Sequence, residues 1–496
     1  MPAIAPDMTL ASLLAGLASV SRAHDRFVTG LCLDSRRVVP GDLFLAVQGS
    51  RDHGADHVAE ALGRGAVAVV QGAVRAESML DGDVPVIYLP GLEHRLGELA
   101  DRFHGRPSRH LHLTGVTGTN GKTSVCHFVA EALSAGGTPC GTMGTLGRGV
   151  HGRLEPTANT TPDVLTVHRT FAEWRNQGLT AGIMEVSSHG LVQGRVDAVA
   201  FDVAVFTNLG RDHLDYHGDL GAYAAAKRRL FQMPGLGTAV INVDDAEGRR
   251  LAALLAPRLD ILTYSLEGRP DAGLRVTRGD FDAAGMTLHI ETPAGAATLS
   301  SGLAGRFQGA NLLAAMGVLL ATGLTAEDAA RRLAGVHALP GRFERFGDPS
   351  GPVVIVDYAH TPDALEQVLG AARALGRGRL TCVFGCGGER DPGKRPAMGA
   401  IAARLADHVV VSDDNPRHED PDDIVADILA GMLAGRLVTV ERDRERAIAA
   451  AVAAAAPGDL VVVAGKGHED YQEVAGVRHP FSDREVARRL VGGTAP

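Results

Sequence analysis

Short apolar runs separated by turns and helical segments recur along the chain. They are most regular in the last third, where runs rich in valine and leucine alternate with alanine-rich helical segments. Because these runs are apolar at nearly every position, they predict strands of a parallel sheet covered by helices on both faces. The four runs occupy residues 353–357, 380–385, 408–412 and 460–464.

Each of these runs is followed by a cluster of polar and charged residues. Parallel strands end at the same edge of a sheet, and in an open α/β sheet ligands bind in the crevice outside that edge. Turn chemistry accounts for one such cluster, but it accounts poorly for four at equivalent strand ends. The clusters, which together predict one binding crevice, occupy residues 357–360, 387–391, 413–417 and 465–469.

The pattern changes twice along the chain, and we therefore predict three domains. A chain of 496 residues exceeds what one hydrophobic core usually supports. Residues 1–90 alternate short strands with a helical stretch near 57–63, which predicts a small α/β domain. Residues 91–340 contain a glycine-rich turn that ends in Gly121-Lys122-Thr123, and they predict a central P-loop-type ATPase domain with a mainly parallel sheet. Residues 341–496 predict a Rossmann-like α/β domain.

Composition narrows the class of protein. The net charge is −9 with histidine neutral, aromatic residues make up 4%, and there is no long basic run, which argues against a nucleic-acid or membrane-surface binder. The five cysteines lack paired metal spacing and predict reduced thiols. With no charged segment before an apolar one at the start and no membrane-spanning stretch, we expect a cytoplasmic monomer without membrane insertion.

A glycine-rich turn at residues 114–124 lies between an apolar run and a helical pattern that begins near Ser124. Gly118 and Gly121 allow backbone N–H groups to converge on phosphate oxygens at a helix N-terminus. Lys122 supplies a positive charge and Thr123 a hydroxyl for magnesium. The strict phosphate-loop pattern needs glycine five residues before Gly121, where this chain has valine, so the match is a variant and an ordinary loop stays an alternative.

Two further clusters in the central region lie at predicted strand ends. Glu185 closes an apolar run, the place where a phosphate-loop enzyme carries a magnesium ligand. His213 lies in a polar cluster directly after the run 203–206, and Lys227 follows in a helical pattern. Taken singly, such a histidine is more often a surface or core residue, and such a lysine is ordinarily a solvated charge. In the first domain, the segment 34–36 is locally consistent with a simple turn.

The motifs resemble those of the Mur ligase family, and the resemblance covers nearly the whole chain. It implies ATP-dependent amide formation, in which UDP-N-acetylmuramoyl-L-alanyl-D-glutamate accepts meso-diaminopimelate and ATP gives ADP and phosphate. Such ligases phosphorylate the acceptor carboxylate, and the amine then attacks the acyl phosphate. The residues that carry the resemblance are 117–123, 185–189, Asp212, His213, 357–360, 414–417 and 465–469.

The resemblance also implies roles for individual residues in ATP binding and catalysis. Catalysis would fall to Lys122, Glu185, His213 and Lys227, with Lys227 carbamylated so that an anionic oxygen replaces its positive charge. Magnesium would be held by Thr123 and Glu185, and a second magnesium by His213 and Lys227. The residues expected to contact ATP are Thr117, Gly118, Thr119, Asn120, Gly121, Lys122, Thr123, Asn311, Arg342, Asp357 and His360.

The two other substrates are assigned in the same way. The expected contacts of the UDP substrate are Leu33, Ser35, Ser50, Arg51, Asp52, Asn159, Thr160, Thr161, Ser187, Gln193 and Arg195. Residues 50–52 differ in type from the usual family pattern. The expected contacts of meso-diaminopimelate are Arg390, Asp414, Asn415, Pro416, Arg417, Gly465 and Glu469.

Alternatives remain within and outside this class. A lysine-adding or other Mur ligase, or a folylpolyglutamate synthase, would share the ATP loop, but an uninterrupted first domain with the segment 33–36 and the cluster 414–417 speak against them. A nucleotide-gated binding protein without ligase chemistry is the alternative from another class. Retention of Lys122, Glu185, His213 and Lys227 favours the enzyme, and product formation from ATP and both substrates discriminates between the two.

Overall fold

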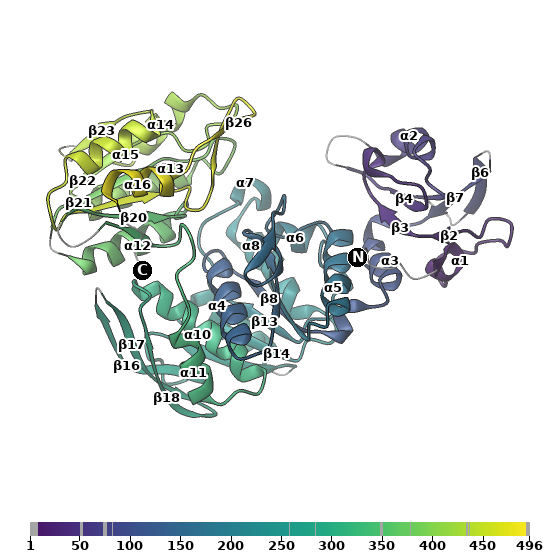
Figure 1. Ribbon diagram of the computed structural model, residues 1–496, viewed down its shortest axis with the longest axis horizontal. Coiled ribbons are helices and arrows are strands. Elements are labelled where there is room, and N and C mark those ends of the chain that lie inside the picture. The colour runs from purple at the N-terminus through teal and green to yellow at the C-terminus, as the bar shows by residue number, and fades with distance from the viewer. Residues whose placement is uncertain are drawn as a thin grey trace. The chain divides into compact units, whose positions relative to one another are not determined.

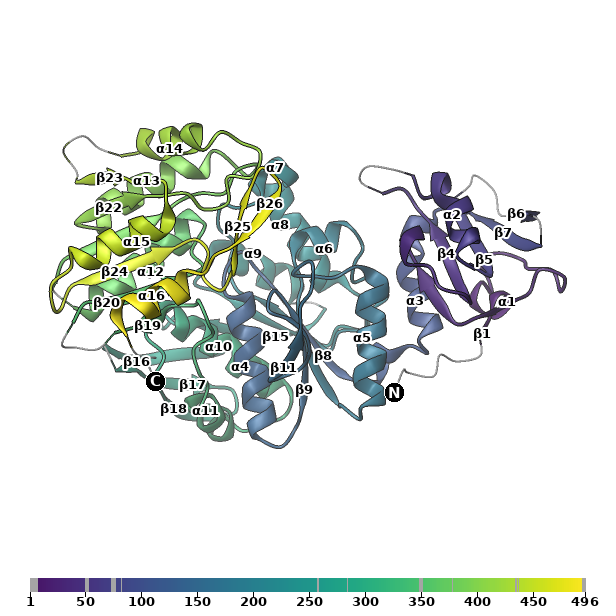
Figure 2. The same ribbon diagram turned by 45° about the horizontal axis from the view of Figure 1, so that its top comes forward.

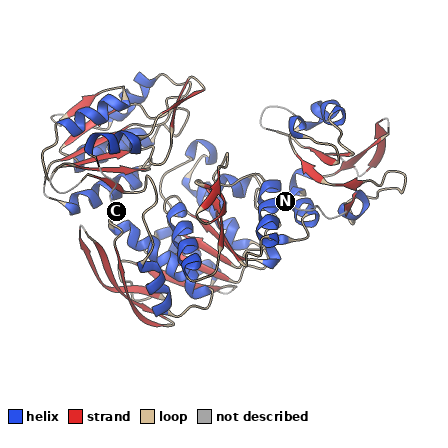
Figure 3. Cartoon of the chain, in the orientation of Figure 1, coloured by secondary structure: helices blue, strands red, loops and turns tan. Residues whose placement is uncertain are grey.

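The computed structural model describes residues 8–49, 53–72, 77–81, 83–256, 258–282, 284–347, 351–376, 378–432, 435 and 437–492 (Figure 1). The chain folds into two compact units, each assembled from separate segments. The first unit contains residues 1–115, 137–204 and 229–237, and the second contains 116–136, 205–228 and 238–496. Figure 3 distinguishes the helices from the strands.

The N-terminal part of the first unit is a five-stranded sheet in the order β3-β4-β5-β7-β6. Pairing is parallel except between β6 and β7. Alternate residues of β4 face opposite sides, so that Leu43 and Leu45 pack in one core cluster and Phe44 and Ala46 in another. The elements are β1 Met8–Thr9, α1 Leu10–Leu13, β2 Phe27–Val28, β3 Gly30–Cys32, η1 Ser35–Arg37, β4 Asp42–Ala46, η2 Gly54–His57, α2 Val58–Gly63, β5 Ala68–Gly72, β6 Glu77–Asp81, β7 Val84–Leu89, η3 Leu92–His94 and α3 Leu96–Phe103.

The remainder of the first unit contains strands in the order β11-β10-β9-β12-β8, of which β8 continues by two residues into the second unit. Strands β9 and β12 are parallel, whereas β9, β10 and β11 form an antiparallel meander. Gly141 leaves room for the buried indole of Trp174, since a Cβ there would lie 2.3 Å from its ring. The elements are η4 Pro107–His110, β8 His112–Thr117, β9 Cys140–Gly144, β10 Gly147–Val150, β11 Arg153–Glu155, α5 Val164–Asn176, β12 Ala181–Glu185, α6 Ser188–Val192 and η5 Arg229–Gln232.

The first part of the second unit continues with strands in the order β13-β14-β15-β16-β17-β18. Pairing is parallel from β14 to β16 and antiparallel from β16 to β18. Strand β13 begins two residues before the unit does. The elements are α4 Lys122–Ala135, β13 Val203–Phe206, α7 Leu214–His217, α8 Leu220–Arg228, β14 Thr238–Asn242, α9 Ala246–Leu255, β15 Asp260–Ser265, β16 Leu274–Asp282, β17 Gly285–Thr292, β18 Gly295–Ser301, α10 Arg306–Ala321 and α11 Ala326–Ala334.

The C-terminal part of the second unit is a six-stranded sheet in the order β19-β20-β24-β21-β22-β23, parallel except at β19 (Figure 2). Val462 and Ala464 pack with α12, α13 and α14, whereas Val461 and Val463 pack with α15 and α16, which confirms the predicted sheet covered on both faces. The elements are β19 Glu344–Phe346, β20 Val353–Asp357, α12 Pro362–Leu375, β21 Leu380–Phe384, α13 Lys394–Leu405, β22 His408–Val411, α14 Pro421–Ala430, β23 Val438–Val440, α15 Arg444–Ala453, β24 Leu460–Ala464, β25 Tyr471–Val474, β26 Val477–Pro480 and α16 Asp483–Val491.

The structure bears on the predictions of fold class, cysteine state and membrane spans. The α/β class with three sheet-containing regions is confirmed. All five cysteines are buried and none is joined in a disulfide, as predicted for reduced thiols. Among the described residues, none of the helices has the length and apolar character needed to cross a membrane. The exact domain boundaries stay a prediction.

A buried histidine in the first unit makes stability depend on pH. His168 is fully buried on α5 and shares a hydrogen bond of 2.9 Å with the carbonyl oxygen of Asp197, and burial lowers its pKa to about 4. Because the unfolded chain binds a proton near pH 6.5 and the folded chain does not, this contribution to stability is lost as pH falls from 6.5 towards 4. At pH 5 the loss is about 2 kcal/mol.

Urea unfolding at pH 7 and pH 5 measures this effect. The variant His168→Gln keeps a hydrogen-bond donor but does not titrate. We expect its free energy of unfolding to fall less between the two pH values than that of the wild-type protein. Equal falls would contradict the prediction.

Candidate active site

The glycine-rich turn lies between β8 and α4, as predicted, although α4 already begins at Lys122. Gly118 and Gly121 have φ values of 147° and 86°, in the region that favours glycine. A Cβ on Gly118 would lie 1.8 Å from Oγ1 of Thr207, and one on Gly121 would lie 2.4 Å from Oδ1 of Asn311. The turn is therefore shaped by close contacts that only glycine permits.

Two lysines converge on this turn. The Lys122 ammonium donates to the carbonyl oxygens of Gly118 and Thr119 at 3.0 and 2.8 Å, and Nζ of Lys227 donates to Gly118 at 2.8 Å. Lys227 is buried on α8 and lies over the ring of Tyr223. Burial, together with the charge of Lys122, holds the pKa of Lys227 well below its usual range. The expectation of a solvated charge at this position is therefore wrong.

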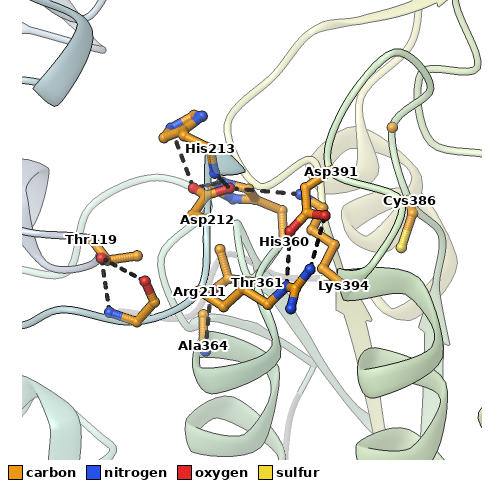
Figure 4. A network of polar contacts seen from close by, with 12 residues as sticks. Thr119, Arg211, Asp212, His213, His360, Thr361, Ala364, Cys386, Asp391 and Lys394 are labelled. Carbon is orange, nitrogen blue, oxygen red and sulfur yellow. Dashed lines mark hydrogen bonds and ion pairs between the residues drawn. The ribbon is translucent and has the colours of Figure 1, made fainter. Parts of the chain in front are cut away.

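A polar network surrounds the buried carboxylate of Asp212 (Figure 4). Its Oδ2 lies 3.3 Å from Nε2 of His213 and 3.6 Å from Nε2 of His360, and its Oδ1 lies 3.9 Å from Nζ of Lys394. Burial raises the pKa of Asp212, but His360, His213 and Lys394 together hold it well below its usual range. Asp212 is therefore an anion that orients His213, whose own backbone has a positive φ of 54°.

A neighbouring ion pair connects the same segment to the loop after β21. Arg211 donates from Nε to one oxygen of Asp391 at 2.9 Å and from Nη2 to the other at 3.2 Å. Asp391 is buried and also accepts from the N–H of Gly393 at 2.9 Å. The segment that carries His213 is thus attached to the loop that carries Arg390 (Figure 4).

The residues predicted to contact the nucleotide from α10 and the C-terminal sheet are also placed in the second unit. Nη2 of Arg342 donates to Oγ1 of Thr123 at 3.3 Å, and its guanidinium lies 4.5 Å from the centre of the Tyr358 ring. Asp357 is buried at the end of β20, and burial raises its pKa to about 6 against the opposing charge of Arg342. The amide of Asn311 donates to Gln308 at 3.0 Å.

Glu185 belongs to the first unit and ends β12, as predicted. It is buried, and its two oxygens accept from the backbone N–H and the hydroxyl of Thr145 at 2.7 and 3.2 Å. The Thr145 hydroxyl in turn shares a hydrogen bond of 3.1 Å with Thr160. Glu185 is thereby held in one orientation by the chain that follows β9.

Part of the predicted UDP-substrate set forms a second cluster in the first unit. The Thr161 hydroxyl accepts from the N–H of Ser187 at 2.9 Å, and Ser187 caps α6 by accepting from Gly190 at 3.1 Å. Arg195 donates to the carbonyl oxygen of Thr161 at 2.7 Å and to Gln193 from two nitrogens. Four predicted residues are therefore joined by hydrogen bonds.

The predicted residues of the N-terminal sheet are only partly described. Ser35 begins η1, which Asp34 caps by accepting from the N–H of Arg36 at 3.1 Å, so the turn predicted for the segment 34–36 is present. Ser35 also donates to Oε2 of Glu60 at 2.7 Å. Leu33 packs against a core cluster of the same sheet. Ser50, Arg51 and Asp52 lie outside the described residues.

The predicted amino-acid-binding residues meet at the ends of β22 and β24. Arg417 has a positive φ of 54°, and its Nη1 donates to the carbonyl oxygen of Gly388 at 2.6 Å. Its backbone is fixed on both sides by β25, because it donates to Glu473 at 3.0 Å and accepts from Ala475 at 2.7 Å. A bulky residue seldom adopts such a backbone, which is typical of functional positions.

Most of the other predicted amino-acid-binding residues are buried near the side-chain amide of Asn415. Nδ2 of Asn415 donates to Oε2 of Glu469 at 2.9 Å, and both Asp414 and Asn415 are buried. Gly465 has a φ of 120°, and a Cβ there would lie 2.5 Å from Asp414. Arg390 is exposed at the neighbouring loop, where its side chain is accessible.

Sequence reasoning assigned no role to several residues that the site contains. Arg211, Asp391, Lys394 and Lys466 join segments that are far apart in the sequence, and local pattern does not reveal such contacts. One signal was available, because the chain has only four lysines among its 49 lysines and arginines. Two of these, Lys394 and Lys466, were overlooked.

Comparison with known proteins adds independent information. Family models match the chain over residues 27–104 (Mur ligase family, catalytic domain), 116–319 (Mur ligase middle domain) and 341–467 (Mur ligase, glutamate ligase domain). A UDP-N-acetylmuramoyl-L-alanyl-D-glutamate--2,6-diaminopimelate ligase of Pseudomonas aeruginosa is 53% identical and covers 94% of this chain and 96% of its own length. The ligase of the same name from Xanthomonas campestris is 50% identical over 96% of both chains.

A solved structure of a ligase with that name is 36% identical, has a TM-score of 0.70 and covers 98% of this chain and 99% of its own. These relationships extend through all three sheet-containing regions. The matched ranges include the glycine-rich turn, the buried Lys227 and polar strand ends described above. The chain therefore belongs to the Mur ligase family.

Proposed function

We propose that the turn of residues 118–123 binds the phosphates of ATP in this Mur ligase. The chain is an ATP-dependent acid–amino-acid ligase, and it adds meso-2,6-diaminopimelate to UDP-N-acetylmuramoyl-L-alanyl-D-glutamate in peptidoglycan precursor synthesis. The observation that carries the assignment of the ATP site is the Lys122 ammonium over the glycine-rich turn, where it donates to the carbonyl oxygens of Gly118 and Thr119 at 3.0 and 2.8 Å. A positive charge at the N-terminus of α4 favours an anionic ligand.

The chemistry follows from what a carboxylate lacks. A carboxylate oxygen is a poor leaving group, so transfer of the acyl group to an amine requires prior phosphorylation of that oxygen by ATP. Phosphoryl transfer depends on positioning and on positive charge against the transferred oxygens. Lys122 supplies that charge, and Arg342, beside Thr123, supplies a second cation near the start of α4. The amine then forms the amide bond as phosphate leaves.

Magnesium fits the donor types present. The Thr123 hydroxyl is buried at the first turn of α4, and the Glu185 carboxylate is buried at the end of β12. Hard oxygen ligands of this kind suit Mg²⁺, which when bound would neutralise phosphate charge. We assign Thr123 and Glu185 as ligands of one magnesium ion, and His213 and a carbamylated Lys227 as ligands of a second. The lowered pKa of Lys227 favours the neutral amine that carbamylation needs.

The cluster of Thr160, Thr161, Ser187, Gln193 and Arg195 is assigned to the UDP substrate, together with Asn159, Leu33 and Ser35. Its support is the hydrogen-bonded arrangement in which Arg195 is held by Gln193 and by the backbone of Thr161. A guanidinium fixed in this way is suited to an anionic substrate group.

Recognition of diaminopimelate is assigned to the ends of β22 and β24. Diaminopimelate differs from lysine by a carboxylate at the far end of the side chain. Discrimination therefore needs a positive group that is left unpaired when lysine binds. Arg417 is suited to this task because its backbone is fixed by β25 and its guanidinium is anchored at Gly388. Arg390, Asp414, Asn415, Pro416, Gly465 and Glu469 complete the assignment.

Arg417→Ala is expected to weaken the use of diaminopimelate by about 10- to 150-fold in kcat/KM, because a charged hydrogen bond is worth roughly 1.5–3 kcal/mol. The measurement compares diaminopimelate and lysine side by side with both enzymes. Arg478→Ala, which removes an exposed arginine from the adjacent hairpin, is the control and should retain the wild-type preference. Equal use of lysine by the wild-type enzyme, or an unchanged preference in Arg417→Ala, would contradict the assignment.

A further inference from the structure

Lysine is scarce in this chain, which uses arginine for nearly all of its positive charge. The four lysines are Lys122, Lys227, Lys394 and Lys466, among 49 lysines and arginines in all. The first two converge on the phosphate-binding turn, and Lys394 faces Asp212. Lys466, directly after β24, is fully buried and has no part in the chemistry described so far. Because Lys466 is fully buried, its position favours a compact ammonium group over a larger guanidinium group.

The contacts of Lys466 connect two residues assigned to diaminopimelate. Its Nζ donates to Oδ1 of Asn415 at 3.0 Å and to Oε2 of Glu469 at 3.1 Å. Oδ1 of Asn415 also accepts from the backbone N–H of Glu473 at 2.9 Å. The amide nitrogen of Asn415 donates to the same Oε2 of Glu469 at 2.9 Å. The Lys466 ammonium, the Asn415 amide and the Glu469 carboxylate are thus all hydrogen-bonded to one another.

This arrangement fixes which way the Asn415 amide faces. The Lys466 ammonium and the backbone N–H of Glu473 can only donate hydrogen bonds. Both therefore require the amide oxygen of Asn415 on their side. The amide nitrogen is consequently directed to Glu469, and its second hydrogen is available to an acceptor. Because Oε2 of Glu469 accepts two hydrogen bonds, its Oε1 is the atom left to receive a donor from a ligand. A zwitterionic ligand end, with its carboxylate and ammonium, matches this pair.

We infer that Lys466 is a positioning residue that holds Asn415 and Glu469 in the orientation that receives the distal, zwitterionic end of the amino-acid substrate. The inference rests on the proposed binding of diaminopimelate by these two residues. Lys466 acts through them and does not itself contact the substrate. A purely structural lysine would affect stability and all substrates alike, whereas a positioning lysine affects the amino-acid substrate alone.

The experiment separates the two half-reactions. ATP and the acceptor carboxylate give an acyl phosphate and ADP. Hydroxylamine then attacks the acyl phosphate directly, giving a hydroxamate and phosphate, and it needs no amino-acid site. The variant Lys466→Met keeps the length of the side chain and removes its donors, whereas Lys466→Gln keeps one polar end. Arg478→Met removes an exposed cation that stacks on Tyr471 of the neighbouring hairpin, and it serves as the matched control.

Lys466→Met is expected to raise the KM for diaminopimelate by about 10- to 100-fold. Hydroxamate formation and the KM values for ATP and the UDP substrate should stay within about threefold of the wild-type values. The KM of Lys466→Gln for diaminopimelate should lie between the values of Lys466→Met and the wild-type enzyme. The KM of Arg478→Met should match the wild-type value. Hydroxamate formation also shows that a variant is folded. If Lys466→Met forms no hydroxamate, Lys466→Gln is measured in its place.

An unchanged KM for diaminopimelate in a variant that still forms hydroxamate would overturn the inference. So would an equal loss of hydroxamate formation and of diaminopimelate use in both Lys466 variants. Failure of the proposed function is a different result, because the wild-type enzyme itself would then form no amide with diaminopimelate.

Discussion

Lys122→Ala is expected to lower turnover by on the order of 100-fold or more, which corresponds to roughly 2.7 kcal/mol of lost transition-state stabilisation. The physical reason is that Lys122 lies at the start of α4 and directs its ammonium over the glycine-rich turn. Charge that gathers on the transferred phosphoryl group would lose this partner. Steady-state ADP release in the presence of all three substrates measures the effect.

The melting temperature is the control for Lys122→Ala. This ammonium donates to two carbonyl oxygens of a turn, and the side chain is half-buried at the start of α4. The melting temperature should therefore change little. Turnover close to the wild-type value would show that Lys122 has no role in phosphoryl transfer.

Lys227→Ala is expected to be inactive and to regain part of its activity with a small carboxylate such as acetate or formate. Carbamylation converts the neutral amine and carbon dioxide into an anionic carbamate and a proton, and an added carboxylate can supply the missing oxygen ligand. The site favours this modification because Lys227 is buried and its pKa is lowered by burial and by Lys122. Activity is measured against carboxylate concentration.

Arg228→Ala is the matched control, because it removes the neighbouring cation on α8, which forms an ion pair with Glu247. It should be nearly as active as wild type and insensitive to carboxylates. Full activity of Lys227→Ala without any carboxylate would rule out the carbamate assignment.

The strands of the C-terminal sheet could be predicted from sequence because their apolar runs are continuous and regularly spaced. The structure has strands at Val353–Asp357, Leu380–Phe384, His408–Val411 and Leu460–Ala464, as expected. The glycine-rich turn was also recognisable, since its glycines have the positive φ values that the motif requires. These features are local, and local pattern is what a single sequence records.

Contacts between distant segments could not be predicted in this way. Asp212 is held by His360 and Lys394, and Arg211 by Asp391, although these residues lie in different parts of the chain. The low pKa of Lys227 likewise depends on burial that a helical pattern does not reveal. Sequence pattern locates strand ends, whereas the folded chain decides which of their side chains meet.

The most direct test of the central claim is to incubate the purified protein with ATP, magnesium, UDP-N-acetylmuramoyl-L-alanyl-D-glutamate and meso-diaminopimelate and to identify the product by mass spectrometry. We predict the tripeptide nucleotide, with one ADP released for each amide formed and with no tripeptide nucleotide when any one substrate is omitted. Lysine in place of diaminopimelate should give far less product. ADP release without amide formation, or equal product from lysine, would contradict the account.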